Sequence, residues 1–431
     1  MTPSARLAAV IELLEAVEAA PRKPADATAN EFFRARRYMG AADRRAVSDR
    51  AWTILRSWRR LAWWVDRAGG LVGPRMLAAA SFLLGGEPLA VLAHLYTGGH
   101  YAPAPLSQAE HAALEKLAGH ALDHPGQRPG VRLELPDWIV PRLKSRFGHD
   151  FDAEMRATLD PAPLDLRTNL LKATREDAQT ALRMEGIEAA PTPISPWGLR
   201  IQGRRAVTTG AAFRDGLVEI QDEGSQIVAA LTGAAPGLRV ADWCAGAGGK
   251  TLALAMLMQN QGTLAACDIS EPRLEGATKR LRRAGVHNAE RHLVTPGDKW
   301  AKRRAGSFDR VLVDAPCTGT GTWRRNPDAR LRLSEADLAE LLVKQSSILD
   351  SAARLVKPGG RLIYATCSVL IDEDEDQVAA FLARSPAFAR IPLAKAWPFD
   401  QAPPCTGPDL LLTPHRHGTD GFFAAVLARA A

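Results

Sequence analysis

Apolar residues recur every three or four positions through the first 120 residues, which is the period of an amphipathic α-helix. Two series of positions keep this period: Leu7, Val10, Ile11, Leu14 and Val17, and then Ala51, Ile54, Leu55, Trp58, Leu61, Ala62 and Val65. The other faces of the second series carry arginines: Arg56, Arg59, Arg60 and Arg67. The pattern predicts a small helical domain over residues 1–130.

The pattern changes after this region. Residues 119–130 are rich in Gly, Pro and His, as is typical of a linker. In Leu135-Pro136-Asp137-Trp138, proline and an acidic residue favour the first turn of another helix. Short alternating runs such as 164–170 then precede an amphipathic stretch at 175–184. We therefore predict a small α+β unit over residues 131–230.

From residue 231 onward, apolar runs typical of strands alternate with helical patterns. The runs lie at 238–242, 263–267, 308–313 and 361–365, with a turn at 357–360 before the last. Alternation of this kind predicts βαβ units and a parallel sheet. The fold class is therefore α/β, with a Rossmann-like domain over residues 231–431 and a ligand site at the carboxyl ends of its strands.

Composition and charge narrow the class of protein. The 431 residues, 46% of them hydrophobic, are enough for two or three domains with large cores. No apolar run approaches the roughly 18 to 20 residues of a membrane span, and the first residues do not resemble a signal peptide. We expect a cytoplasmic protein, monomeric and without membrane association. A net charge of +7 and a pI near 9.3 favour a polyanionic partner.

Six arginines gather in the predicted helical domain. A solvated helix surface and an RNA-binding surface both account for such a cluster. We expect the nearby aromatic residues Tyr38, Trp52 and Trp58 to lie in the core. The arginines are Arg34, Arg36, Arg37, Arg44, Arg45 and Arg50.

The five cysteines include no pair at the spacing of a zinc site, and their odd number argues against a disulfide framework. We expect no metal and a reducing compartment. Cys244 and Cys267 read as packing residues, and Cys405 as a loop thiol.

A glycine-rich turn, Cys244-Ala245-Gly246-Ala247-Gly248-Gly249-Lys250-Thr251, follows the first strand of the predicted parallel sheet. Glycines let a ligand approach the backbone, and the following helix offers free N–H groups. A phosphate-binding P-loop would need glycine at Cys244, and a dinucleotide site would need glycine at Thr251. Asp268, at the end of the next strand, is placed to accept from ribose hydroxyls. A single turn followed by an acid suits S-adenosylmethionine best.

Two cysteines end the next two predicted strands, in Asp314-Ala315-Pro316-Cys317 and Thr366-Cys367-Ser368. Free cysteines are often only small buried hydrophobes. If the strands are neighbours, however, both thiols converge on one pocket at the ligand-binding edge of the sheet.

Two thiols suit methylation of carbon 5 of a cytosine. A thiolate that adds to carbon 6 makes the ring an enamine, which can take a methyl group from a sulfonium. A base must then remove the proton from carbon 5, and the second thiol can serve. Asp314 is placed to accept from the exocyclic amine of the base.

Taken together, the glycine turn and the two cysteine motifs resemble the Nop/Sun family of S-adenosylmethionine-dependent RNA 5-methylcytosine methyltransferases. Further segments of the chain are similar to family segments: Asn169-Leu170-Leu171-Lys172, Gln221-Asp222-Glu223-Gly224-Ser225, Arg324-Arg325-Asn326-Pro327-Asp328 and Asp420-Gly421-Phe422-Phe423. The chain departs from the family at Ala247, where the family has proline.

The resemblance implies a class I methyltransferase domain in which Cys367 attacks carbon 6 and Cys317 assists release of the product. Asp314 would lie between cofactor and base, Asp268 at the ribose and Asp298 near the adenine. Residues of the turn would line the cofactor: Cys244, Ala245, Gly246, Ala247, Gly248, Gly249 and Lys250.

The resemblance also bears on the substrate. The N-terminal helices are similar to the NusB-like RNA-binding domain of the bacterial ribosomal RNA member of the family, and we expect the α+β unit to bind RNA as well. The expected substrate is 16S rRNA, with tRNA as the alternative. A ribosome assembly factor that binds without catalysis is a second alternative.

Overall fold

The computed structural model describes residues 1–203, 205–295 and 297–431. The chain forms two compact units. The first, the helical unit, comprises residues 1–160 and 323–335. The second, the sheet unit, comprises residues 161–322 and 336–431.

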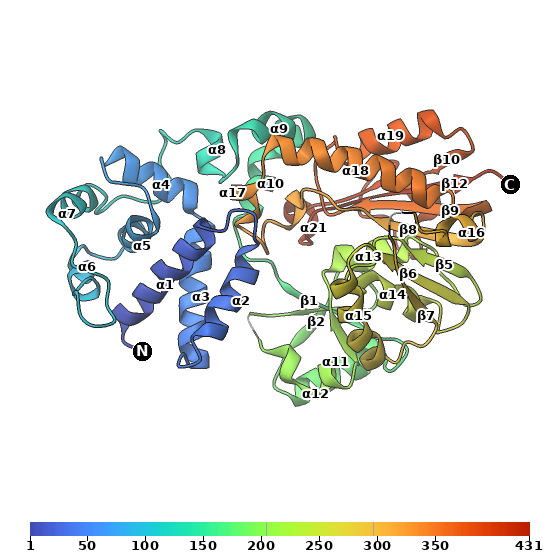
Figure 1. The fold of residues 1–431 in the computed structure, drawn as a ribbon, viewed down its shortest axis with the longest axis horizontal. Helices are drawn as coiled ribbons and strands as arrows, with labels where there is room; N and C mark the ends of the chain where they lie inside the picture. The colour runs from blue at the N-terminus through green and yellow to red at the C-terminus, as the bar shows by residue number, and fades with distance from the viewer. Residues whose placement is uncertain (204, 296) are drawn as a thin grey trace. The chain divides into compact units, whose positions relative to one another are not determined.

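The helical unit consists of helices and loops (Figure 1). Its helices are α1 (Pro3–Glu18), α2 (Ala25–Ala35), α3 (Ala41–Leu55), α4 (Trp58–Arg67), α5 (Pro74–Leu83), α6 (Ala90–Leu95), α7 (Gln108–Glu115), α8 (Pro129–Arg132), α9 (Val140–Phe147), α10 (Phe151–Ala157) and α17 (Ala329–Arg332).

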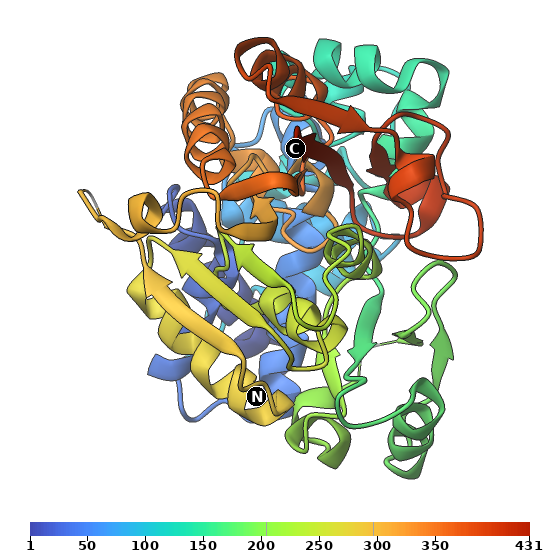
Figure 2. The same ribbon diagram turned by 90° about the vertical axis from the view of Figure 1, so that its right-hand side faces the viewer.

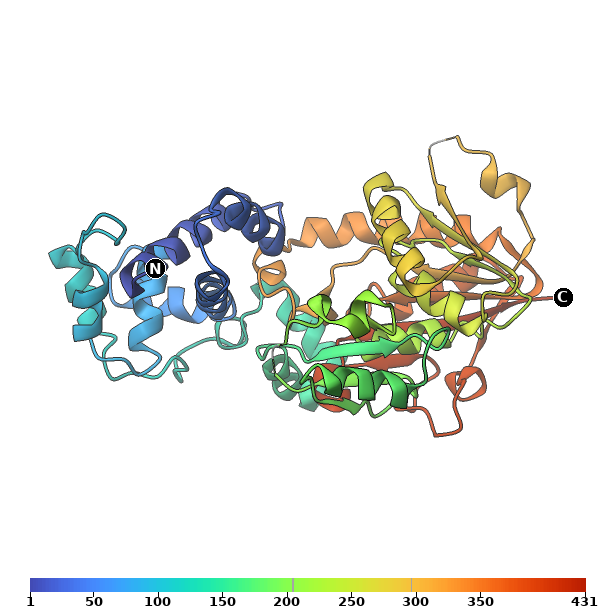
Figure 3. The ribbon, with the colours of Figure 1, turned by 90° about the horizontal axis from the view of Figure 1, so that it is seen from below.

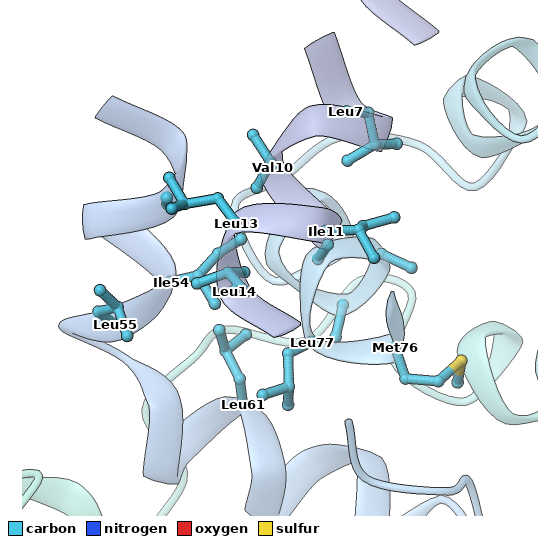
Figure 4. Close-up of a cluster of buried hydrophobic side chains, with 14 of the residues drawn as sticks. Leu7, Val10, Ile11, Leu13, Leu14, Ile54, Leu55, Leu61, Met76 and Leu77 are labelled. Carbon is cyan, nitrogen blue, oxygen red and sulfur yellow. The ribbon is translucent and has the colours of Figure 1, made fainter. Parts of the chain in front are cut away.

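The core of this unit confirms the helical periodicity. Leu7, Val10 and Leu14 of α1 are buried and point toward apolar side chains of α3, α4 and α5 (Figure 4). The second series of apolar positions spans two helices rather than one, because the chain leaves the helix at Arg56 and Ser57. The Ser57 hydroxyl donates to the Thr53 carbonyl there.

A buried carboxylate caps the start of α4. Glu134 accepts from the backbone N–H groups of Arg59 at 2.7 Å and Arg60 at 3.1 Å, and from Nε of Arg60 at 2.9 Å. Free N–H groups at a helix start need acceptors, and the dipole favours a negative charge there. Burial raises the pKa of Glu134 although Arg60 opposes the shift. This contact holds α4 to the loop that follows α8.

Residues 323–335 belong to the helical unit although they follow the first cysteine motif by only a few positions. The buried guanidinium of Arg330 donates to the Thr158 carbonyl at 3.0 Å, and the Asp328 carboxylate accepts from the N–H of Ala25 at the start of α2. One segment resembling the family, 324–328, thus packs among the N-terminal helices. The predicted domain boundaries at 130 and 230 stay predictions.

The stretch expected to be a linker is a packed loop. The indole of Trp64 donates to the Leu122 carbonyl at 3.0 Å, and the ring of His124 lies 5.1 Å from that of Trp63. The prediction that Tyr38 lies in the core is wrong, because this residue is 73% exposed. Trp52 and Trp58 pack against the core while partly buried.

The sheet unit begins with a four-stranded antiparallel sheet in the order β2-β3-β1-β4 (Figure 3, teal to green). Its elements are β1 (Leu164–Thr168), α11 (Arg175–Met184), β2 (Ala189–Pro191), β3 (Gly198–Ile201), α12 (Ala211–Arg214) and β4 (Val218–Ile220). Thr174 and Asp177 form a capping box at the start of α11. The predicted α+β unit is confirmed.

A larger sheet follows, in the order β10-β12-β9-β8-β5-β6-β7, with β11 paired to β12. Its strands are β5 (Arg239–Asp242), β6 (Thr263–Asp268), β7 (Ala289–Leu293), β8 (Phe308–Asp314), β9 (Val356–Thr366), β10 (Phe388–Ile391), β11 (Leu410–Leu412) and β12 (Phe422–Arg429).

The prediction of a parallel sheet is right for β5 to β9 (Figure 2) and wrong at the C-terminal edge. There β12 runs antiparallel between β9 and β10. It follows β11 through a short connection with no long crossover helix, which suits an antiparallel partner. The turn predicted at 357–360 lies within β9, where the pairing with β8 is irregular between Phe308 and Arg310.

Helices cover both faces of the large sheet (Figure 1). Val311 and Val313 pack on the face covered by α18 and α19, and Leu312 packs on the face covered by α13 and α14. The helices are α13 (Glu223–Ala230), α14 (Gly249–Leu257), α15 (Glu271–Ala284), α16 (Trp300–Arg303), α18 (Glu335–Ala353), α19 (Glu375–Arg384), α20 (Leu393–Ala396) and α21 (Pro414–His417). Within the described ranges, every helix is too short or too polar to cross a membrane.

Glu134→Ala should lower the free energy of unfolding by about 3 kcal/mol, because it leaves Nε of Arg60 without its acceptor, although Asp123 still pairs with this guanidinium, and uncaps α4. Urea unfolding followed by circular dichroism measures the change. The exposed Glu31, whose carboxylate pairs with Lys23, supplies the matched control. Glu31→Ala should change the stability by less than about 0.5 kcal/mol, and an equal loss in the two variants would contradict the capping role.

Candidate active site

The glycine-rich turn connects β5 to α14 through two left-handed residues, Gly246 at φ +54° and Gly248 at φ +81°. A Cβ on Gly248 would lie 3.0 Å from the Cβ of Ala277 on α15. A Cβ on Gly246 would meet no atom within 4 Å. The turn therefore packs against α15 at Gly248 and leaves room for a ligand beside Gly246.

Asp268, at the end of β6, is fixed by the same turn. Its carboxylate accepts from the N–H groups of Gly246 and Ser270, both at 2.8 Å. Its side chain is buried. The remaining acceptor capacity of the carboxylate faces a ligand in a defined direction, as the predicted ribose contact requires.

A cavity of about 480 Å³ opens beside the turn. This volume lies in the usual range for small-molecule sites. Most of the predicted site residues line it: Cys244, Ala245, Gly246, Ala247, Gly249, Lys250, Asp268, Asp314, Cys317 and Cys367. Gly248 lies in the turn without lining the cavity.

Apolar and cationic residues that the sequence analysis missed also line the cavity, among them Trp243, Ile269, Arg273, Arg280 and Val294. Ile269 is 83% exposed although it is a large aliphatic residue. A ligand with a ribose, a flat apolar base and both charges fits this set of side chains. The residues thus suit S-adenosylmethionine.

Lys250 and Asp314 form an ion pair at the edge of the cavity, with Nζ to Oδ2 at 2.6 Å. The ammonium also lies 5.3 Å from the ring centre of Phe422, on β12. Burial lowers the pKa of Lys250, but the neighbouring Asp314 carboxylate outweighs it and the pKa lies above its usual value. Lys250 therefore stays charged beside the reactive groups.

The two predicted thiols meet. Sγ of Cys317 lies 3.4 Å from Sγ of Cys367, and both cysteines are free. The hydrogen bond with Cys367, together with burial, raises the pKa of the Cys317 thiol well above its usual value. Cys244 also lines the cavity, with its pKa raised well above the usual value by burial, and Cys267 is buried in the core.

A buried carboxylate braces the first cysteine loop. Glu373 accepts from the N–H of Thr318 at 2.8 Å and from the amide of Gln345 at 2.9 Å, and Gln345 also donates to the Pro316 carbonyl. The sequence analysis missed Glu373. It stands in the run Asp372-Glu373-Asp374-Glu375, and a run of acids is normally a solvated surface. Instead Glu373 and Asp374 are fully buried.

Two glycines join the C-terminal segment 420–423 to the first cysteine loop. Gly421 donates its N–H to the Gly321 carbonyl at 2.8 Å, just after the Cys317 loop. A Cβ on Gly321 would lie 2.2 Å from the Gly421 carbonyl oxygen. The Gly321 N–H in turn donates to the Cys367 carbonyl at 3.0 Å. The backbone of residues 420–423 thus closes the cysteine loop from one side.

Asp298 lies apart from the other predicted site residues. Its carboxylate contacts His292 and accepts from the Trp300 N–H at 2.8 Å. It lines a neighbouring cavity of about 680 Å³, which shares Trp243 and Val294 with the first. The predicted contact of Asp298 with an adenine stays a prediction.

Asp242, at the end of β5, is the second acid that the sequence analysis missed. It is fully buried and accepts from the Thr251 hydroxyl at 2.7 Å, and within the described part of the chain its Oδ1 has no hydrogen-bond partner. Burial raises its pKa to about 7, and the negative charge of Asp314 adds to the shift. The sequence signal that could have identified Asp242 is its position at the end of an apolar strand, directly before the glycine turn.

Two family profiles match the chain. One, described as 16S rRNA methyltransferase RsmB/F, matches residues 231–428, and the other, a ferredoxin-like domain of RsmF/B-like methyltransferases, matches residues 135–208. The second match agrees with the small antiparallel sheet and its helices.

Two curated relatives and one solved structure agree with these profile matches. Ribosomal RNA small subunit methyltransferase B of Xylella fastidiosa is 37% identical over 297 residues, 68% of this chain and 68% of the relative. The probable methyltransferase of the same name in Synechocystis is 34% identical over 321 residues, 73% of this chain and 71% of the relative. The crystal structure of PH0851 covers 99% of both chains at 28% identity, with a TM-score of 0.78.

Gly248→Ala should weaken binding of S-adenosylmethionine about tenfold or more, because a Cβ there both strains the left-handed backbone and presses on Ala277. Isothermal titration calorimetry measures the affinity. Gly237 has a similar φ of +83° with no atom near an added Cβ, so Gly237→Ala carries the strain alone. That variant should lose stability and keep its affinity; equal affinities of the two variants would contradict the prediction.

Asp242→Asn should stabilise the protein more at pH 8 than at pH 5. Between pH 4 and pH 7 the folded protein holds a proton on Asp242 that the unfolded chain has released, so this group lowers stability as pH rises. The loss is on the order of 1.4 kcal/mol per pH unit. Asparagine can still accept from Thr251. Thermal melts of both proteins at the two pH values measure the difference, and a gain independent of pH would contradict the prediction.

Proposed function

The chain belongs to the RsmB/F family of 16S rRNA methyltransferases and is an RNA (cytosine-C5)-methyltransferase with S-adenosylmethionine as methyl donor; we propose that its substrate is 16S rRNA and that it acts through a covalent cysteine–cytosine intermediate. The observation that carries the proposal is the pair of thiols, 3.4 Å apart, in the wall of the cavity formed by the glycine turn.

We propose that the cavity beside the turn holds the cofactor. Bound there, S-adenosylmethionine supplies a methyl group activated on a sulfonium. The Asp268 carboxylate accepts from the ribose hydroxyls, and the N–H groups at the start of α14 receive a carboxylate. Ile269 and Val294 cover the apolar base. Asp298, from the neighbouring cavity, would approach the adenine.

The unequal surroundings of the thiols support different roles for them. Cys317 holds its proton strongly because it is buried and bonded to Cys367. It can therefore donate to the sulfur of Cys367. The charge of Lys250 interacts with Cys367 as well. Cys367 thus has a hydrogen-bond donor and a cation beside its sulfur. We therefore assign the attack to Cys367.

With Cys367 as the nucleophile, the reaction consists of attack, methyl transfer and elimination. The Cys367 thiolate forms a bond to carbon 6 of the cytosine, and the electron pair of the 5,6 double bond makes carbon 5 nucleophilic. Carbon 5 takes the methyl group. Loss of the carbon 5 proton to a base then restores the double bond and expels the Cys367 thiolate.

The addition of Cys367 to carbon 6 also changes the surroundings of the Cys317 thiol. Once its sulfur is bonded to carbon 6, Cys367 no longer carries a negative charge, so the hydrogen bond to a Cys367 thiolate and the charge of that thiolate no longer raise the pKa of Cys317, although burial still does. Cys317 can then pass its proton to water in the cavity and, as a thiolate, accept the carbon 5 proton. Asp314, held by Lys250 at the cavity edge, accepts from the exocyclic amine and orients the ring.

We infer the remaining features from the same site and from the relatives. Two catalytic thiols this close need a reducing compartment, which suits the cytoplasm. The helical unit and the ferredoxin-like domain would position the RNA, and the chain would act as a monomer. In the helical unit three of the six clustered arginines are engaged by protein: Arg36 pairs with Glu12, Arg44 donates to the Met39 carbonyl, and Arg50 stacks on Phe82. The RNA surface would then use Arg34, Arg37 and Arg45.

The purified protein should transfer labelled methyl groups from S-adenosylmethionine to unmodified 16S rRNA, and nuclease digestion should recover them as 5-methylcytosine. tRNA is the matched alternative substrate. Transfer to tRNA alone would overturn the substrate proposal. Absence of transfer to either RNA, with cofactor binding intact, would favour the non-catalytic assembly factor.

Cys367→Ala should abolish transfer, a loss of at least about 10³-fold, and form no protein–RNA adduct. Cys317→Ala should accumulate an adduct that survives denaturing electrophoresis, because the methylated intermediate cannot collapse. Cys405→Ala removes a thiol outside the cavity and should leave both readouts unchanged. An adduct in Cys367→Ala and none in Cys317→Ala would reverse the two roles.

A further inference from the structure

The segment from Arg167 to Lys172 joins the ferredoxin-like domain to the helices that flank the cofactor cavity. Three of its side chains donate to backbone carbonyls beyond their own sheet. Asn169 donates to the Ala284 carbonyl at 2.8 Å, and Lys172 to the Arg283 carbonyl at 2.7 Å, both at the end of α15. Arg167 donates to the Gly249 carbonyl at 3.0 Å, at the start of α14.

The contact of Arg167 differs from the other two because it reaches the cofactor turn. Its guanidinium also donates to the amide oxygen of Gln221. The amide nitrogen of Gln221 donates to Ser225 at 3.1 Å. Gln221, Ser225 and Gly249 all line the cavity, whereas Arg167 does not. Arg167 therefore touches the cavity only through the residues that it holds.

A second arginine holds the other side of Gly248. Arg280, on α15, donates to the Ala247 carbonyl at 2.7 Å. Its guanidinium pairs at 3.4 Å with Glu219, on β4 of the ferredoxin-like sheet. The two carbonyls on either side of Gly248 are thus each bound to an arginine, and both arginines are anchored in or paired with the same small sheet.

Fold stability does not account for Arg167. Its side chain is almost fully buried, its Nε has no hydrogen-bond partner among the described residues, and its two hydrogen-bond acceptors are neutral, while the charge of Glu219 acts on it without a hydrogen bond. Burial lowers the pKa of Arg167 to about 10, so it is still charged at neutral pH. A buried charge without a bonded counter-ion usually destabilises a fold relative to an apolar residue of the same size. The presence of Arg167 therefore needs a benefit other than stability of the fold.

The peptide geometry of the turn indicates that benefit. A peptide unit is planar, so fixing the carbonyl of Gly249 also fixes the direction of the Lys250 N–H. That N–H is one of the free donors at the start of α14. Fixing the Ala247 carbonyl likewise sets the Gly248 N–H, which closes the turn onto the Ala245 carbonyl at 2.9 Å.

We propose that Arg167 and Arg280 are positioning residues for the cofactor turn, so that the ferredoxin-like domain is a structural part of the S-adenosylmethionine site. Without these donors the turn samples other conformations, and the cofactor must order it on binding. The inference rests on the cofactor site of the proposed function.

Arg167→Met is the direct test, since methionine fits a buried slot and donates nothing. Calorimetry should show affinity for both S-adenosylmethionine and S-adenosylhomocysteine reduced about 10- to 100-fold. In methylation assays the KM for S-adenosylmethionine should rise by a similar factor while kcat changes little. The matched control is Lys172→Met, which cuts a contact to α15 without touching the turn, and it should keep the wild-type affinity.

Each outcome decides the proposal. Unchanged affinity in Arg167→Met, or an equal loss in Lys172→Met, would overturn it in favour of a merely structural contact. If Arg167→Met does not fold, Arg280→Met and Arg280→Gln decide instead: glutamine retains a donor for Ala247, so it should bind the cofactor nearly as the wild type, and methionine should not. Equal losses in these two would mean that the charge of Arg280 touches the ligand directly. Failure of the wild type to bind either ligand would refute the cofactor site itself.

Discussion

Parallel pairing of β8 with β9 is the interaction on which the active site depends. The register sets Asp314 opposite Ala365, and the Ala315 N–H donates to the Ala365 carbonyl just beyond the last strand pair. Because both strands end at the same edge, the loops that follow bring Cys317 and Cys367 to 3.4 Å. A shift of one residue in this pairing would turn one thiol to the opposite face of the sheet. The glycine turn follows β5, the other neighbour of β8, so the cofactor cavity is placed by the same register.

Several charged groups around the cavity are buried in ways that weaken the fold. Among the described residues, Lys250 pairs only with the partly exposed Asp314 and Arg167 has no bonded carboxylate, while Asp242 has a pKa of about 7. Unfavourable burial of charge is common where a site must hold charges in fixed directions for a ligand or a transition state. The helical unit differs in this respect: its buried Glu134 accepts three donors and caps a helix.

The sequence was sufficient to predict the parallel strands, the glycine turn and the convergence of the thiols, because each rests on a local pattern whose consequence is set by strand geometry. It was insufficient for features that depend on contacts between residues far apart in the chain. The position of β12 between β9 and β10 depends on strand order, which periodicity does not encode. Glu373 stands in an acidic run, and only the fold buries it. The attachment of residues 323–335 to the N-terminal helices rests on contacts of Asp328, Arg330 and Leu331 with residues far away in the chain.

The contact between Gly321 and Gly421 has a consequence for the order of events during synthesis. The loop that carries Cys317 is closed by backbone from residues 420–423, which leave the ribosome long after both catalytic cysteines. At about 5 to 20 residues per second, several seconds pass between translation of Cys367 and of Gly421. Throughout that interval the nascent chain has its nucleophile but lacks the strand that completes the loop around it. The loop around Cys317 can therefore close only after residues 420–423 have been made.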